Sequence, residues 1–140
     1  MLADMHLHPG GAPEPLRGAL STVWRLSDGV ELCSTAHPLV SGGTNSNEPA
    51  TGADLNETSL EAAVIQIAGW TDERGLLIAA KPRKLVVPSD LQFVATRLLD
   101  TELRVNTADN DINALRHNGS IPEGYTVNHY LTDTNAWFLL

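Results

Sequence analysis

The stretch DLNETSLEAAVIQIAGWTDERG, residues 54–75, contains the clearest helix signal in the chain. Its apolar side chains recur at spacings of three and four residues, as one face of an α-helix requires. These residues are Leu60, Ala63, Val64, Ile67 and Ala68. Asp54 with Glu57 three residues later is typical of a capping box, and Gly75 can end the segment. The stretch therefore predicts a helix with a single buried face.

A strand and a second helix are predicted directly after this segment. KLVVP, residues 84–88, indicates a short buried strand that the proline stops. Ser89 with Gln92 predicts the cap of the next helix. Its apolar residues repeat the same helical spacing. They are Leu91, Val94, Ala95, Leu98 and Leu99.

The C-terminal part of the chain predicts a short helix and two strands. Residues 107–119 indicate the helix, with Ile112 and Leu115 facing inward and Gly119 at its end. YTVNHYL, residues 125–131, and AWFLL, residues 136–140, are β-rich runs joined by a hairpin turn at residues 132–135. Because AWFLL would leave an unprotected edge strand, we expect these residues to be the interior of a longer polypeptide. The whole pattern predicts an α+β fold.

The segment before residue 54 is rich in residues that break regular structure. Prolines and glycines between residues 1 and 22 predict an extended arm. VWRLSDGVELCST, residues 23–35, predicts a two-stranded ribbon that turns at Ser27, Asp28 and Gly29. Residues 36–53 then form a long loop with Gly42 and Gly43 near its middle. Loops of more than about 12–15 residues usually serve binding, gating or extension, so this loop is a candidate functional segment.

Composition excludes several classes of function. A chain of 140 residues is the length of one domain, and its formal net charge of -8 has the wrong sign for neutralising phosphates. Nucleic acid is therefore not an expected partner. The one cysteine, Cys33, cannot form an internal disulfide and is expected to be a reduced thiol. No membrane span and no secretory signal are recognisable, which predicts a soluble intracellular protein.

Two groups of residues have a spacing that metal sites use. His6 and His8 would face the same way on a strand, but no third ligand lies nearby. Asp109, Asp111 and Asn113 match positions 1, 3 and 5 of a calcium loop. The match then fails, because Ala114 stands where the turn glycine is needed and Ser120 where the glutamate is needed. Helix capping by Asp109 or Asn110 explains these polar residues better, and we expect no metal site.

The sequence also contains no complete catalytic motif. Ser34, His37 and Asp54 could be read as a hydrolase triad, but no nucleophile elbow or phosphate-binding loop accompanies them. The neighbouring carboxylates Asp72 and Glu73 are typical of a solvated surface. The basic cluster at residues 81–84 indicates an exposed face or an interface contact. We therefore expect neither a catalytic residue nor a cofactor.

The order of these segments resembles the major capsid (head) proteins of tailed bacteriophages, in particular the Mu-type major head subunit group with the Hong Kong phage capsid fold. The resemblance covers residues 28–140. It rests on DGVELCSTAHPLVSGGTNSN, DLNETSLEAAVIQIAGWTDERGL, KPRKLVVPSDLQFVATRLL, TADNDINAL and PEGYTVNHYLTDTNAWFL.

This resemblance implies an organisation of the chain. Residues 1–27 would be an atypical N-terminal arm and residues 28–53 the extended-loop region that embraces a neighbouring subunit. Residues 54–84 would hold the spine helix and peripheral-domain strands, and residues 85–140 part of a mixed α/β axial domain. The glycines, prolines and amides of residues 34–48 would then supply bending and adhesion.

The resemblance also implies a function: a structural subunit that self-assembles into the icosahedral head enclosing packaged DNA. Its partners would be copies of itself in hexamers and pentamers, with a scaffold, portal or head protease as further candidates. It would be found in the virion after assembly in the cytoplasm of the bacterial host. Two alternatives stay open. One is an encapsulin-like compartment shell, and the other is a small metal-dependent hydrolase that uses His6, His8, His37 or His129.

Overall fold

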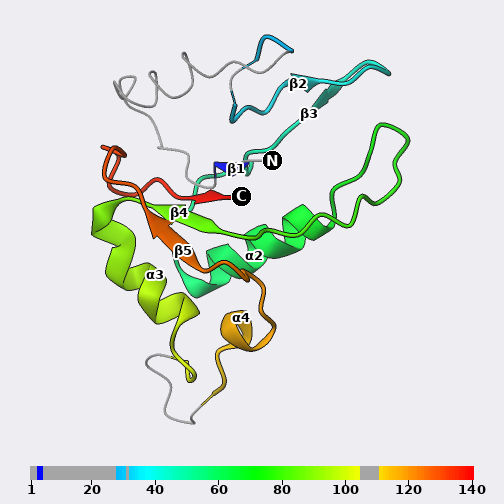
Figure 1. Cartoon of the computed structure of the whole chain (residues 1–140). Coiled ribbons are helices and arrows are strands. Elements are labelled where there is room, and N and C mark those ends of the chain that lie inside the picture. Colours follow the sequence, from blue (N-terminus) through cyan, green and yellow to red (C-terminus); the bar gives the residue numbers. More distant parts are fainter. Residues whose placement is uncertain (1–2, 5–27, 31, 105–110) are drawn as a thin grey trace.

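The computed structural model describes residues 3–4, 28–30, 32–104 and 111–140. Within these ranges there are three α-helices, α2 (Glu57–Ala68), α3 (Gln92–Leu99) and α4 (Ala114–His117), and a 3₁₀ turn, η1 (Ser89–Leu91). The strands are β1 (Ala3–Asp4), β2 (His37–Pro38), β3 (Thr44–Asn45), β4 (Leu85–Val87), β5 (Tyr125–Val127) and β6 (Phe138–Leu139) (Figure 1). The mixed α+β class is therefore confirmed. Apart from β1, the predicted N-terminal arm lies outside the described residues.

The main sheet has four strands in the order β1-β6-β4-β5. β4 pairs in parallel with β5 on one side and antiparallel with β6 on the other, and β6 also pairs with β1. The predicted strand at residues 84–88 is confirmed. The predicted hairpin between the two C-terminal strands is wrong, because fully buried Leu85 and Val87 place β4 between them. The expected bare edge is also wrong, since β6 is covered by β1 and β4.

The core lies where α2 and α3 pack with the sheet. Its largest fully buried side chains, apart from Pro88, are Trp137, Leu60, Leu85, Leu139 and Val87. Each apolar side chain of this size contributes about 1.5–3 kcal/mol when it is fully removed from water. Ala63 and Ile67 of α2 and Ala95 and Leu99 of α3 belong to the same cluster. Burial of one face therefore holds both helices on the sheet.

The start of α2 differs by two residues from the prediction. The Ser59 N–H donates to Oδ1 of Asn56 at 2.9 Å, and the Asn56 N–H donates to Oγ of Ser59 at 3.0 Å. This reciprocal pair is the capping box, so the prediction of Asp54 with Glu57 is wrong. The helix ends at Gly69 and not at Gly75, because Trp70 turns toward the core. Ala68, expected in the buried face, is exposed.

Two predictions about the later helices also need correction. Ser89 does not cap α3, because its hydroxyl lies 3.1 Å from Nδ1 of His129 and η1 leads directly into the helix. Ile112, predicted to face inward, is 61% exposed. Its neighbour Asn113 is buried instead and caps α4, while Leu115 is buried as predicted. Asn113 can be buried because its side-chain amide forms hydrogen bonds with backbone groups.

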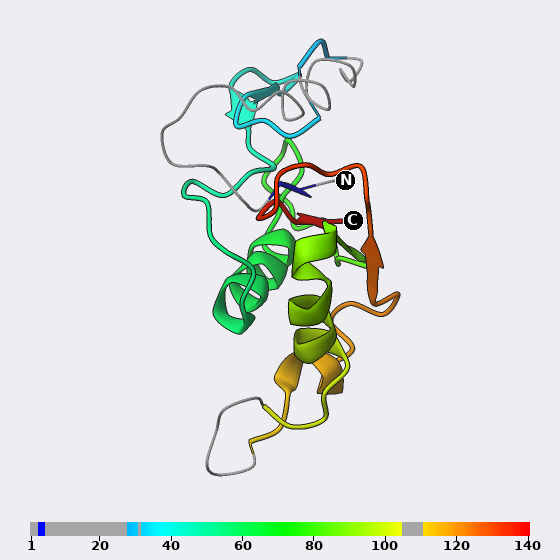
Figure 2. The same cartoon turned by 90° about the vertical axis from the view of Figure 1, so that its left-hand side faces the viewer.

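Two hairpins extend from this body. β2 and β3 form an antiparallel ribbon at the opposite end of the molecule from α4 (Figures 1 and 2). The described residues among 28–36 carry turns and bends, so the ribbon lies later in the chain than the predicted one at 23–35. A second hairpin, in which Thr71 bridges Leu77, extends past the C-terminal end of α2 (Figure 1).

Candidate functional site

The first candidate site is the segment of residues 28–53, which we call the strap. Its shape depends on Asn47, a buried amide that is only 4% exposed. Oδ1 of Asn47 accepts the N–H of Ser34 at 2.8 Å, and Nδ2 donates to the carbonyl of Leu32 at 2.7 Å. The Asn47 N–H also donates to the carbonyl of Ser34 at 3.1 Å. One side chain thus joins the two ends of the β2–β3 ribbon.

The tip of the strap is a tight turn at residues 39–43. The Gly42 N–H donates to the carbonyl of Leu39, and the Leu39 N–H donates to the carbonyl of Gly43. Gly42 and Gly43 have φ angles of 88° and 93°, which residues with a Cβ rarely adopt. Val40 is 93% exposed at this tip. The turn therefore exposes the Val40 side chain to solvent on a backbone that its own hydrogen bonds hold in place.

The strap also contains a histidine–carboxylate contact. Nδ1 of His37 lies 2.9 Å from Oδ2 of Asp28. Because a carboxylate only accepts hydrogen bonds, Nδ1 carries the hydrogen in this contact. The hydrogen bond lowers the pKa of Asp28 below its ordinary value of 3.8, with help from the Val30 N–H. Nε2 of His37 is buried and has no hydrogen-bond partner within the described part of the chain.

These contacts differ from those of a hydrolase triad formed by Ser34, His37 and Asp54. The carboxylate that contacts His37 is Asp28, not Asp54. The Ser34 hydroxyl accepts the N–H of Ala36 at 3.1 Å, as in a local turn. Asp28 was not predicted as the partner of His37, because nine residues separate them and nothing in that spacing indicates a contact. The contact holds the strap together.

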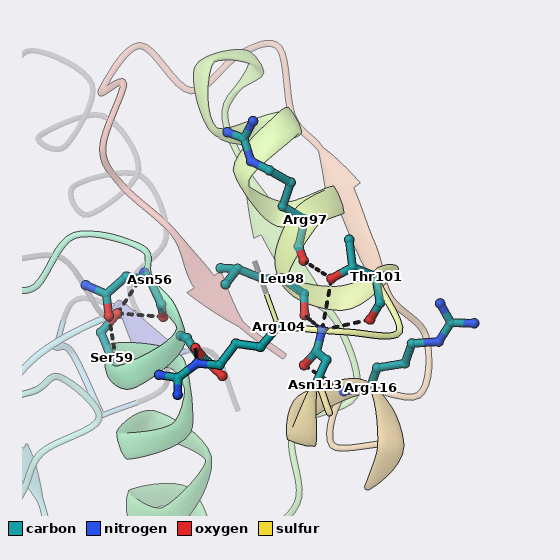
Figure 3. A network of polar contacts seen from close by, with 9 residues as sticks. Asn56, Ser59, Arg97, Leu98, Thr101, Arg104, Asn113 and Arg116 are labelled. Atoms are coloured by element: carbon teal, nitrogen blue, oxygen red, sulfur yellow. Dashed lines mark hydrogen bonds and ion pairs between the residues drawn. The ribbon is translucent and has the colours of Figure 1, made fainter. Parts of the chain in front are cut away.

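The second candidate site is a cavity of about 190 Å³ between the start of α2 and α3, which we call the helix pocket. Leu55, Val94 and Leu98 supply its apolar wall. Arg97 and Arg104 supply positive charge at its edge. Figure 3 shows the guanidinium of Arg97 pointing away from the polar cluster around Asn113. The pocket therefore combines an apolar interior with an available cation.

Asn113 forms one wall of the helix pocket and fixes its shape. Its Nδ2 donates to the carbonyl of Leu98 at 2.8 Å and to the carbonyl of Thr101 at 3.0 Å (Figure 3). Its Oδ1 accepts the N–H of Arg116 at 3.4 Å, which caps α4. The Thr101 hydroxyl in turn donates to the carbonyl of Arg97 at 2.6 Å. One buried amide thus ties α4 to the end of α3.

An ion pair closes the other side of the helix pocket. Nε of Arg104 donates to Oε2 of Glu57 at 2.7 Å, joining the segment after α3 to the first turn of α2. This contact raises the pKa of Arg104 above its ordinary value. The Arg104 side chain is 46% exposed, so solvent screens its attraction to Glu57. The ion pair therefore orients the side chains of Glu57 and Arg104 at the edge of the pocket and adds little to the stability of the fold.

The other predicted polar groups are not brought together into a site. The residues that the structure describes contain no group of three or more histidine, cysteine, aspartate or glutamate side chains placed to hold a metal. His6, His8 and Asp109 lie outside those residues, and the amide of Asn113 is committed to the backbone. Arg83 and Lys84 of the basic cluster contact Glu123 at 2.9 Å and 3.2 Å. None of the helices in the described ranges is long and apolar enough to cross a membrane.

Residues 48–117 match the family described as Mu-like prophage major head subunit gpT. This match spans half of the 140 residues, which identifies the class of the protein as a structural subunit of a bacteriophage head. The chain belongs to the Mu-like gpT family. The matched range includes α2, β4, α3, α4 and the helix pocket. No curated protein and no solved structure matches the chain.

The family match confirms the resemblance drawn from the sequence and the capsid function that it implied. Major head subunits assemble with copies of themselves, and their place is the capsid of the virion. The match does not extend over residues 28–47 or 118–140, which the sequence resemblance also covered. Neither alternative function gains support from the match.

Proposed function

We propose that this chain builds an icosahedral head by self-assembly with the subunit arrangement of the Hong Kong phage capsid fold. In this arrangement α2 is the spine helix of residues 54–84, residues 85–140 belong to the axial domain, and the strap is the extended loop. Membership of the major head subunit family supports the proposal, and so does the mixed α+β body.

The observation that carries the proposal is the position of the strap. The β2–β3 ribbon stands at one end of the molecule, apart from the main sheet and its helices (Figures 1 and 2). Its shape is set by internal contacts, those of Asn47 above all, and its tip exposes Val40. A preshaped projection of this kind loses little entropy when it docks on a neighbouring subunit.

The same proposal assigns no catalysis to the chain. The family is one of structural capsid proteins, and two of the candidate triad residues, Ser34 and His37, make contacts within the strap. A scaffold, portal or head protease would be further partners, and assembly would take place in the cytoplasm of the bacterial host. The net charge of -8 would keep packaged DNA from adhering to the inner surface.

Sedimentation of the 140-residue chain at increasing concentration tests the proposal. We expect concentration-dependent oligomers and shells visible by electron microscopy. Replacing residues 39–43 with a flexible glycine–serine turn should leave the thermal unfolding midpoint nearly unchanged and prevent shell formation. A chain that stays monomeric at high concentration, or assembles equally well without its strap tip, would contradict the proposal. A matched control is Tyr130→Ser, which removes an equally exposed side chain (88%) far along the chain from the strap.

A further inference from the structure

The hairpin after α2 exposes three consecutive apolar side chains. Leu76, Leu77 and Ile78 are 64%, 70% and 48% exposed. We call them the knob. Runs of three or more exposed apolar residues are rare on soluble surfaces unless they serve a contact. The knob therefore requires a partner surface.

The hairpin holds the knob in a defined shape. Oδ1 of Asp72 accepts the N–H groups of Arg74 and Leu76 at 2.8 Å and 2.9 Å, and the Asp72 N–H donates to the carbonyl of Leu76 at 2.8 Å. Gly75 allows the turn with a φ angle of 80°. At the base, Ala79 has a φ angle of 51°, a strained value of the kind that collects at functional segments. The apolar residues are thus presented by a shaped projection.

The helix pocket has the chemistry to receive this projection. Its apolar wall is formed by Leu55, Val94 and Leu98, and polar residues that include Glu57 and Arg97 also line its volume of about 190 Å³. An apolar cavity of about 150 Å³ is large enough to hold a benzene ring, so the helix pocket has room for an aliphatic side chain. The volume and the apolar wall are therefore suited to one leucine of the knob.

Charge favours the same pairing. Glu73 lies at the exposed turn of the hairpin, and its carboxylate makes no ion pair within the described residues. Arg97 lies at the edge of the helix pocket with its guanidinium directed outward (Figure 3). An acidic turn beside an apolar knob is complementary to a basic edge beside an apolar pocket. Complementary charges of this kind fix the register of a contact.

We propose that the knob of one copy docks in the helix pocket of the next copy, with Leu77 inserted and Glu73 beside Arg97. This inference rests on the proposed self-assembly and names one of its contacts. Knob and pocket are different surfaces of the same chain, so the contact is heterologous. Heterologous contacts repeat around a ring and close it when the rotation allows, as the capsomers of a shell require.

Cross-linking between two differently sized chains tests the contact directly. Both carry Cys33→Ser, so that the added thiols are the only ones. A tagged Glu73→Cys chain is mixed with an untagged Arg97→Cys chain and treated with a short bis-maleimide. We expect the mixed dimer in at least about fivefold higher yield than when Thr126→Cys, an exposed position on β5, replaces Arg97→Cys. Equal yields would overturn the proposal.

Substitutions provide a second test that does not depend on cross-linking. Leu77→Ser should lower the association constant by about tenfold or more, as expected for loss of one buried leucine contact, while Tyr130→Ser should leave it unchanged. Glu73→Arg and Arg97→Glu should each weaken association, and the double variant should recover it to within about threefold of the original chain.

The outcomes separate this inference from the proposed function. If the unaltered chain assembles and Leu77→Ser assembles equally well, the knob contact is wrong while self-assembly stands. If the unaltered chain stays monomeric and no pair of thiols cross-links, both are wrong. Cross-linking of Glu73→Cys mainly to itself would replace the heterologous contact by a symmetric one and would also overturn the inference.

Discussion

Nε1 of Trp137 donates a hydrogen bond of 3.0 Å to the carbonyl of Ala53, across 84 residues of sequence. Trp137 is fully buried directly before β6, and Ala53 is the last residue of the strap. This hydrogen bond joins the end of the strap to the main sheet, directly before the start of α2.

Trp137 should contribute to stability both through its ring and through its N–H. Trp137→Phe keeps most of the apolar contact and removes the donor, and we expect a loss of about 0.5–1.5 kcal/mol in the free energy of unfolding. Trp137→Ala should cost about 3–5 kcal/mol, because it also leaves a cavity. Urea denaturation followed by circular dichroism measures both. If the two variants lost the same amount, packing of the ring would not be the larger contribution.

Asn47 should control the order of the strap without controlling the stability of the body. Asn47→Ala removes the two side-chain hydrogen bonds with the backbone of Ser34 and Leu32, each worth about 1 kcal/mol, so proteolytic cleavage between residues 32 and 48 should become about tenfold faster. The unfolding midpoint of the body should stay nearly unchanged. Asn45→Ala is the control, because the hydrogen bond of the Asn45 side chain within the described residues is a local one with the N–H of its neighbour, Ser46. Equal cleavage rates in the two variants would contradict the anchoring role of Asn47.

Asn113 should be the most sensitive polar residue around the helix pocket. Asn113→Ala removes the donor to the carbonyls of Leu98 and Thr101, and we expect a loss of about 2–3 kcal/mol in the free energy of unfolding. Asn113→Asp keeps an acceptor for the cap of α4 but cannot donate to those carbonyls. It should therefore be at least as destabilised as the alanine variant.

Urea denaturation of the two Asn113 variants separates their causes. If the aspartate variant were as stable as the original chain, capping of α4 would be the main role of Asn113. Asn118→Ala is the control, since Asn118 is an exposed residue at the other end of α4. It should change the free energy of unfolding by less than about 0.5 kcal/mol.

Helices and strands were predicted correctly where a regular pattern of apolar side chains is buried in the fold. The spacing of Leu60, Ala63 and Ile67 predicted α2, and the apolar run at residues 85–87 predicted β4, because burial of these side chains fixes the local structure. Strand partners could not be predicted, since β5 and β6 both carry β-rich sequences and only the burial of β4 on both sides places it between them.

The candidate sites were predicted less completely than the fold. The glycine-rich segment at residues 36–53 was predicted to be a long loop, and the structure places the β2–β3 ribbon within it. Asn47 and Asn113 were not recognised as buried, because a sequence does not show which backbone groups lack partners until the chain is folded. The knob could have been recognised from the sequence, because three consecutive apolar residues lie outside a helix. No sequence pattern indicated the helix pocket.

The contact between Asp28 and His37 should be visible in a pH titration. Because the hydrogen bond from His37 lowers the pKa of Asp28, the ionised carboxylate is favoured in the folded chain. The contribution of Asp28 to the order of the strap is therefore complete above its ordinary pKa of 3.8 and is lost as the pH falls through the lower folded value. Carboxyl carbon shifts measured by NMR report this titration.

His37→Ala provides the matched comparison for this titration. Without the imidazole, the pKa of Asp28 should rise toward its ordinary value of 3.8, although the Val30 N–H still favours the ionised form. His37→Gln retains a donor and should give an intermediate value. An Asp28 titration that is identical in all three proteins would show that the imidazole does not contact this carboxylate in solution.

Two neighbouring alanines at the base of the knob hairpin should respond in opposite directions to the same substitution. Ala79 has a φ angle of 51°, where a Cβ costs about 1–2 kcal/mol and glycine has no such strain. Ala79→Gly should therefore be neutral or should stabilise the chain by up to about 1 kcal/mol, after the greater freedom of glycine in the unfolded state is counted. Ala80 has an ordinary φ angle and packs against the core, so Ala80→Gly should destabilise the chain by about 1 kcal/mol. Thermal unfolding of the two variants under identical conditions measures the difference. Equal destabilisation would mean that the backbone at Ala79 relaxes in solution, and the knob would then lack the fixed shape that its docking requires.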